Sequence, residues 1–82
     1  MAITVYTKPG CFQCRSTERW LDKKGVEYED IDITKSPDDL QAVLALGYKA
    51  APVVVVSRPE THEDVHWYGF NPYMLAEHCL RD

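Results

Sequence analysis

The chain has 82 residues and three cysteines, and this length makes one domain over residues 1–82 the expectation. Apolar residues make up 45% and charged residues 27%, which is typical of a folded globular protein rather than a disordered one. The formal net charge of −4 lacks the basic surface that nucleic acid binding requires. The N-terminus has no secretion-signal pattern, and no apolar run is long enough to cross a membrane. We therefore expect a cytoplasmic monomer that binds neither nucleic acid nor membrane.

The first half of the chain predicts two strands, each followed by a helix. Residues 3–6 are β-branched and aromatic, as is typical of a strand. Residues 12–24 contain no strong helix breaker and are followed by a glycine, which predicts a helix. Residues 26–33 alternate between apolar and acidic side chains and predict a second strand. A serine-proline pair begins a second helix over residues 36–46. The predicted apolar stripes are Cys14, Thr17 and Leu21 in the first helix and Leu40, Val43 and Leu44 in the second.

The second half predicts two further strands and a final helix. Residues 53–56 are consecutive valines, which favours a strand buried on both faces. Residues 65–68 predict another strand, and the polar segment 57–64 is interpreted as a long loop between the two. An Asn-Pro pair at residues 71–72 begins the last helix. The order β-α-β-α-β-β-α, with its first two strands parallel and its last two antiparallel, predicts an α/β thioredoxin fold with a four-stranded mixed sheet flanked by three helices.

Two of the cysteines, Cys11 and Cys14, lie where the first loop meets the first helix. The unpaired N–H groups and the positive dipole end of a helix N-terminus stabilise a thiolate. We therefore expect Cys11 to attack a substrate disulfide, and Cys14, nearly one turn further along, to resolve the mixed disulfide. Lys8 adds a positive charge that would favour the thiolate, although an exposed lysine is more often simply solvated.

Two other uses of this cysteine pair are less consistent with the sequence. A structural zinc site needs four ligands, and the remaining candidates are scattered: Cys79, His62, His66 and His78. A permanent disulfide across two residues closes a very small loop, which stabilises a fold least, and a reducing compartment would open it. Cys79 is interpreted as a buried thiol in the last helix. We therefore expect redox chemistry and no metal site.

Four stretches resemble the NrdH redoxins, a glutaredoxin-like branch of the thioredoxin superfamily. They are residues 4–9 (TVYTKP), residues 11–14 (CFQC), the block 45–54, and residues 67–72 (WYGFNP). The resemblance implies a thiol-disulfide oxidoreductase that acts as an electron carrier and holds no bound cofactor. It further implies that NADPH supplies electrons through thioredoxin reductase, and that the chain then reduces the large subunit of class Ib ribonucleotide reductase.

The resemblance also assigns roles to residues around the cysteine pair. It implies a cis peptide bond before Pro52, whereas sequence alone would favour trans, and it places Ala51 where its backbone can pair with a substrate peptide. Trp67 and Phe70, which their positions alone would assign to the core, are implied to form an exposed apolar patch that docks protein partners. The other residues implied to contact substrate or partner are Lys8, Phe12, Gln13 and Gly69.

The chain departs from the redoxin pattern at Tyr68, Asn71 and Tyr73, where serine, arginine and aspartate are common. A glutathione-dependent glutaredoxin is the nearest alternative. Such proteins usually have Pro-Tyr between the cysteines, a Thr-Val-Pro turn and a Gly-Gly-x-x-Asp helix start. This chain has Phe-Gln, Ala-Ala-Pro and Gly-Phe-Asn at those places, so the anion site at the helix N-terminus is incomplete. A metal-binding or iron-sulfur-bridging module that uses Cys11 is a further alternative.

Overall fold

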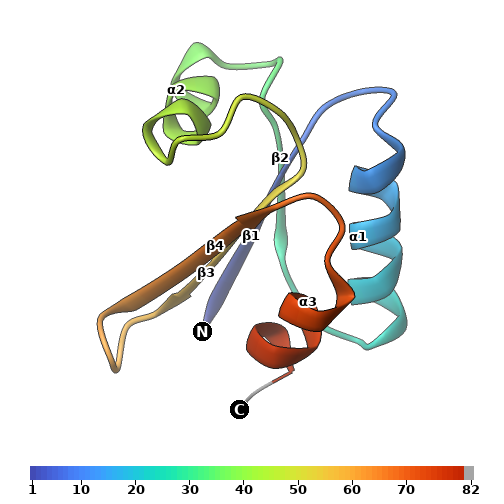
Figure 1. The fold of residues 1–82 in the computed structure, drawn as a ribbon, viewed down its shortest axis with the longest axis vertical. Helices are drawn as coiled ribbons and strands as arrows, with labels where there is room; N and C mark the ends of the chain where they lie inside the picture. Colours follow the sequence, from blue (N-terminus) through green and yellow to red (C-terminus); the bar gives the residue numbers. More distant parts are fainter. Residues whose placement is uncertain (81–82) are drawn as a thin grey trace.

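The computed structural model describes residues 1–80, and they form four strands and three helices (Figure 1). The elements in chain order are β1 (Ala2–Thr7), α1 (Phe12–Lys23), β2 (Glu29–Asp32), α2 (Pro37–Ala45), β3 (Val53–Arg58), β4 (Glu63–Tyr68) and α3 (Pro72–Cys79). This is the predicted order β-α-β-α-β-β-α. No helix within residues 1–80 has the length and apolar character needed to span a membrane.

The four strands form one mixed sheet in the order β2-β1-β3-β4. The pair β1 and β2 is parallel, whereas β3 runs antiparallel to both β1 and β4. Helices α1 and α3 lie side by side on one face of the sheet, and α2 lies on the other (Figure 1). The predicted thioredoxin fold is therefore confirmed.

The buried side chains form two clusters, one on each face of the sheet. The larger cluster lies under α1 and α3 and consists of Ile3, Val5, Leu21, Val54, Val56, Trp67, Leu75 and Cys79. The smaller cluster includes α2 and consists of Cys11, Cys14, Ile33, Val43, Ala51 and Val53. Successive valines of β3 alternate between the two clusters because side chains alternate across a strand. The prediction that this strand is buried on both faces is therefore confirmed, and the cysteine pair belongs to a packed core.

The two helices predicted to carry apolar stripes differ in how they use them. All three stripe residues of α1 are buried, as predicted. In α2 only Val43 is buried, whereas Leu40 and Leu44 are 39% and 41% exposed. The predicted stripe of α2 was therefore wrong for both leucines, and Val43 alone of the three belongs to the smaller core.

The strand β2 is shorter at its start than the alternation over residues 26–33 predicted. Gly25 adopts a positive φ of 69°, a conformation that favours glycine and commonly ends a helix. The N–H of Val26 then donates to the carbonyl of Leu21 at 3.0 Å. Val26 is thus held by the end of α1, and pairing with β1 begins only at Glu29.

The predicted loop 57–64 is mostly part of a β-hairpin. Ser57 pairs with Asp64 and Arg58 pairs with Glu63, so the connection shrinks to residues 59–62. Polar side chains at an exposed hairpin end can pair through their backbones without a buried face. The hydrophobic pattern therefore did not reveal these strand ends, and the long-loop prediction was wrong.

Candidate active site

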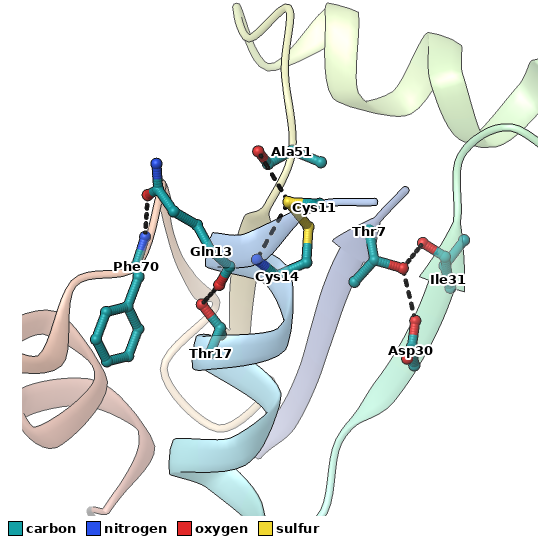
Figure 2. The surroundings of a disulfide bond; sticks show 9 residues. All are labelled: Thr7, Cys11, Gln13, Cys14, Thr17, Asp30, Ile31, Ala51 and Phe70. Atoms are coloured by element: carbon teal, nitrogen blue, oxygen red, sulfur yellow. Dashed lines mark hydrogen bonds between the residues drawn. A yellow bond between two sulfur atoms is a disulfide. The ribbon is translucent and has the colours of Figure 1, made fainter. Parts of the chain in front are cut away.

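Cys11 and Cys14 are joined by a disulfide bond at the N-terminus of α1 (Figure 2). Cys11 is the N-cap residue, and its Sγ accepts a hydrogen bond from the N–H of Cys14 at 3.1 Å. Their Cα atoms are 5.2 Å apart, and they are 8% and 2% exposed. The prediction that Cys14 is the less exposed of the two is confirmed. An N–H donor directed at Sγ is the interaction that stabilises a thiolate once the disulfide is reduced.

The segment before β3 faces the disulfide. The Ala51–Pro52 peptide bond is cis, as the resemblance implied. The carbonyl oxygen of Ala51 lies 3.7 Å from Sγ of Cys11 (Figure 2). A disulfide sulfur carries no hydrogen, so this is a contact in the oxidised state and a hydrogen bond only for a Cys11 thiol. Backbone pairing of Ala51 with a substrate peptide stays a prediction.

Gln13, between the two cysteines, holds the turn that precedes α3. Its Oε1 accepts a hydrogen bond from the N–H of Phe70 at 2.9 Å (Figure 2). Gly69 has a φ of +87°, and a Cβ at this position would lie only 3.0 Å from the same Oε1. The N–H of Gly69 donates to the carbonyl of Pro52 at 2.9 Å. Gln13, Gly69 and Pro52 therefore tie three segments together, and the positive φ at position 69 favours glycine.

The aromatic residues expected to contact a substrate or partner divide between surface and core. Phe12 is 73% and Phe70 is 37% exposed, whereas Trp67 is only 6% exposed. Trp67 pairs with Val54 across the sheet and shares its face, so its indole packs in the larger core under α1 and α3. The expectation that Trp67 belongs to an exposed patch was wrong.

Lys8 is exposed in the loop between β1 and α1. It lines an open pocket of about 490 Å³ together with Thr7, Pro9, Asp30, Asp32 and Lys35. Two carboxylates thus share the surroundings of Lys8, and opposite charges at an exposed site interact weakly. A contribution of Lys8 to thiolate formation stays a prediction.

A carboxyl pair that sequence reasoning missed lies one helical turn after Cys14. Glu18 of α1 is hydrogen-bonded to Asp30 of β2, and the hydroxyl of Thr7 donates to the same Asp30 at 2.8 Å (Figure 2). Burial, followed by the hydrogen bond and negative charge of Asp30, raises the pKa of Glu18 from 4.5 to about 7. No local pattern marks this pair, because the two carboxyl groups come from different elements.

We expect Glu18 to make the folded protein less stable as the pH rises from 5 to 8. Between its unfolded pKa near 4.5 and its folded pKa near 7, the folded state holds the extra proton, so raising the pH favours unfolding. Glu18→Gln keeps a hydrogen-bond donor toward Asp30 but does not titrate. Its Tm relative to the natural protein should therefore increase across this range in thermal unfolding followed by circular dichroism. Parallel pH dependences of the two proteins would contradict the prediction, and Glu27→Gln, at an exposed loop carboxylate, is the control.

The third cysteine lies outside this site. Cys79 is 2% exposed within the larger core, and burial raises the pKa of its thiol to about 11. The interpretation of Cys79 as a buried thiol is confirmed. Among residues 1–80, no group of three or more histidine, cysteine or acidic side chains is arranged to hold a metal ion.

The Cys-x-x-Cys pair forms a disulfide at a helix N-terminus, and a cis-proline segment of the thioredoxin fold faces it. This arrangement defines a thiol-disulfide oxidoreductase, and the cysteine pair itself is its redox group. The chain belongs to the glutaredoxin family, whose model matches residues 3–59, and within it to the glutaredoxin-like NrdH proteins. It is 33% identical to NrdH of Lactococcus lactis over 75 residues, which cover 92% of this chain and 96% of that protein. It is 35% identical to NrdH of Escherichia coli, with 92% and 85% covered. The solved structure of NrdH-redoxin from Escherichia coli superimposes with a TM-score of 0.85 at 33% identity, covering 100% of this chain and 97% of that chain.

Proposed function

We propose that this chain is a dithiol electron donor for class Ib ribonucleotide reductase. Thioredoxin reductase then reduces its disulfide again with electrons from NADPH. The NrdH relatives over nearly the whole chain support the first partner. The NrdH-redoxin of Escherichia coli is described as having a thioredoxin-like activity profile, which supports thioredoxin reductase as the second partner. We also propose a cytoplasmic location, because the reducing systems of the cytoplasm return such a disulfide to its dithiol form.

The hydrogen bonds in the turn before α3 favour thioredoxin reductase over glutathione as the electron source. A helix N-terminus binds carboxylates through its free N–H groups. Here the N–H of Phe70 is taken by Gln13, the N–H of Met74 is taken by the side chain of Asn71, and Pro72 has none. The turn therefore offers few donors to the carboxylates of glutathione, which supports a protein rather than this tripeptide as the electron source.

The proposed reaction proceeds in two exchanges. The thiolate of Cys11 attacks one sulfur of the substrate disulfide, which forms a mixed disulfide and releases the other substrate sulfur as a thiolate. Cys14 then loses its proton and attacks Sγ of Cys11, so that the second substrate sulfur leaves and the Cys11–Cys14 disulfide forms. Two electrons and two protons pass to the substrate, which leaves as a dithiol. Thioredoxin reductase returns two electrons from NADPH to the pair.

Insulin-disulfide reduction coupled to NADPH oxidation tests this proposal. We expect turnover with thioredoxin reductase and little turnover with glutathione plus glutathione reductase. The reduced protein should also support class Ib ribonucleotide reductase as the only dithiol present. Turnover in the glutathione system alone would contradict the proposal and favour the glutaredoxin alternative. Stoichiometric metal or an iron-sulfur absorbance in the purified protein would instead favour a metal-binding module.

A further inference from the structure

A solvent-open groove of about 240 Å³ lies between α1 and the turn that precedes α3. Its lining residues are Ser16, Arg19, Trp20, Lys23 and Phe70. The Phe70 ring lies beside α1, and its backbone is fixed by the hydrogen bond to Gln13 (Figure 2). Gln13 is the neighbour of Cys14, so the groove begins beside the redox motif. The hydrogen bond from the N–H of Phe70 to Gln13 connects this lining residue to the motif.

The acidic side chains of α1 near this groove are engaged elsewhere. Asp22 accepts a hydrogen bond from the hydroxyl of Tyr28 at 3.0 Å, and Glu18 is hydrogen-bonded to Asp30. Tyr28 and Asp30 both belong to the segment that follows α1 toward and into β2. The negative charges of α1 are therefore directed to the β2 side of the helix.

Two of the three basic side chains of α1 line the groove instead. Arg19 and Lys23 lie one helical turn apart and both line it, and neither forms an ion pair with any of residues 1–80. The ammonium group of Lys24, which is not among the lining residues, lies 5.7 Å from the ring centroid of Trp20 in a cation–π contact. A chain with a net charge of −4 thus places unpaired positive charge around two aromatic side chains, Trp20 and Phe70.

We propose that this groove binds an acidic peptide segment bearing an apolar side chain, carried by the protein whose disulfide the chain reduces. The aromatic rings of Trp20 and Phe70 supply apolar contact area, and Arg19 and Lys23 supply charge complementarity. The position beside Gln13 presents the neighbouring disulfide of the bound protein to Cys11. The inference rests on the proposed dithiol chemistry and adds to it the class of substrate that the site selects.

Single-turnover reduction of two matched peptides tests the proposal. Each peptide carries a Cys-x-x-Cys disulfide and a nearby leucine, and they differ only in flanking glutamates or glutamines. We expect the acidic peptide to reach half-maximal rate at a lower concentration, by about two- to fivefold for each ion pair formed. Raising the salt concentration to about 0.5 M should remove most of this advantage, because exposed charges are screened.

Charge reversals on the groove supply the matched variants. Arg19→Glu and Lys23→Glu should each reduce the preference for the acidic peptide while leaving the rate at saturation unchanged. Lys35→Glu makes the same charge change in the loop between β2 and α2 and should leave the preference intact. Circular dichroism of each variant checks that it is folded. Equal concentration dependence for the two peptides, or a preference that survives both reversals, would overturn the proposal.

Two other occupants of the groove give distinct results. If the reversals slow reduction of glutathione disulfide and leave the acidic peptide unaffected, the groove serves a small carboxylate and the peptide proposal is wrong. A dimer in sedimentation that Arg19→Glu dissociates would assign the groove to a second copy of the chain and would also overturn it. The protein is reduced chemically before each reaction, so these outcomes do not depend on whether thioredoxin reductase is the electron source.

Discussion

Cys11→Ser is expected to abolish disulfide reduction, with kcat/KM lower by about a thousandfold or more, because a serine hydroxyl does not replace the attacking thiolate. Cys14→Ser keeps the attacking group but lacks the resolving one. It should therefore accumulate a mixed disulfide with the substrate. The burial of the two residues agrees with this division, since Cys11 at the N-cap is the more exposed, at 8% against 2%.

The adduct is measured by mass spectrometry and by non-reducing gel electrophoresis after mixing each reduced variant with a substrate disulfide. Cys79→Ala is the control, because the buried thiol of Cys79 lies outside the site and its removal should leave trapping by Cys14→Ser unchanged. A mixed disulfide formed by Cys11→Ser, and not by Cys14→Ser, would reverse the two assigned roles. Such a result would mean that the N-cap position does not select the nucleophile.

Leu75→Ala is expected to have the largest effect on stability among single substitutions in α3. The side chain of Leu75 is fully buried and joins α3 to the larger core, together with Leu21 of α1 and Val54 of β3. Replacing a buried leucine by alanine costs about 2–5 kcal/mol in the free energy of unfolding, because apolar contact is lost and a cavity remains. For a chain of this length the Tm should fall by about 10 °C or more.

Urea and thermal unfolding measure this loss. Leu44→Ala, which makes the same chemical change at a side chain that is 41% exposed, is the matched control and should lower the free energy of unfolding by less than about 1 kcal/mol. Equal losses for the two variants would contradict the burial that the structure assigns. Because α3 begins two residues after Phe70, Leu75→Ala should also weaken the turn that Gln13 holds.

Features that depend on local pattern could be predicted from the sequence. A β-branched run followed by a loop and a breaker-free helix was sufficient to place Cys11 at a helix N-terminus. The stripe of Cys14, Thr17 and Leu21 identified the buried side of that helix, because residues three and four apart share a face. The run of valines similarly identified a central strand, since only a strand covered on both faces is apolar at every position.

Features that depend on contacts between distant segments could not be predicted in this way. Polar residues at the far end of the hairpin carry no periodic signal, so β3 and β4 were longer than expected. The strand position of Trp67 alone favoured the core, whereas the resemblance placed it in an exposed patch, and the pairing of Trp67 with Val54 across the sheet shows that it lies on the core face. The cis bond before Pro52 followed only from resemblance, since a proline at a strand start is compatible with either isomer.

The order of the elements, the position of the cysteine pair and the chemistry of such a pair could all be inferred from the residues alone. These follow from spacing along the chain, which is visible in the residues themselves. Three contacts became visible only in the folded structure: Gln13 accepts a hydrogen bond from the N–H of Phe70, and Glu18 is hydrogen-bonded to Asp30. The third is the groove that Arg19 and Lys23 line together with Trp20 and Phe70. Each of these joins side chains from separate elements, and packing of the whole sheet and its helices is what brings them within reach.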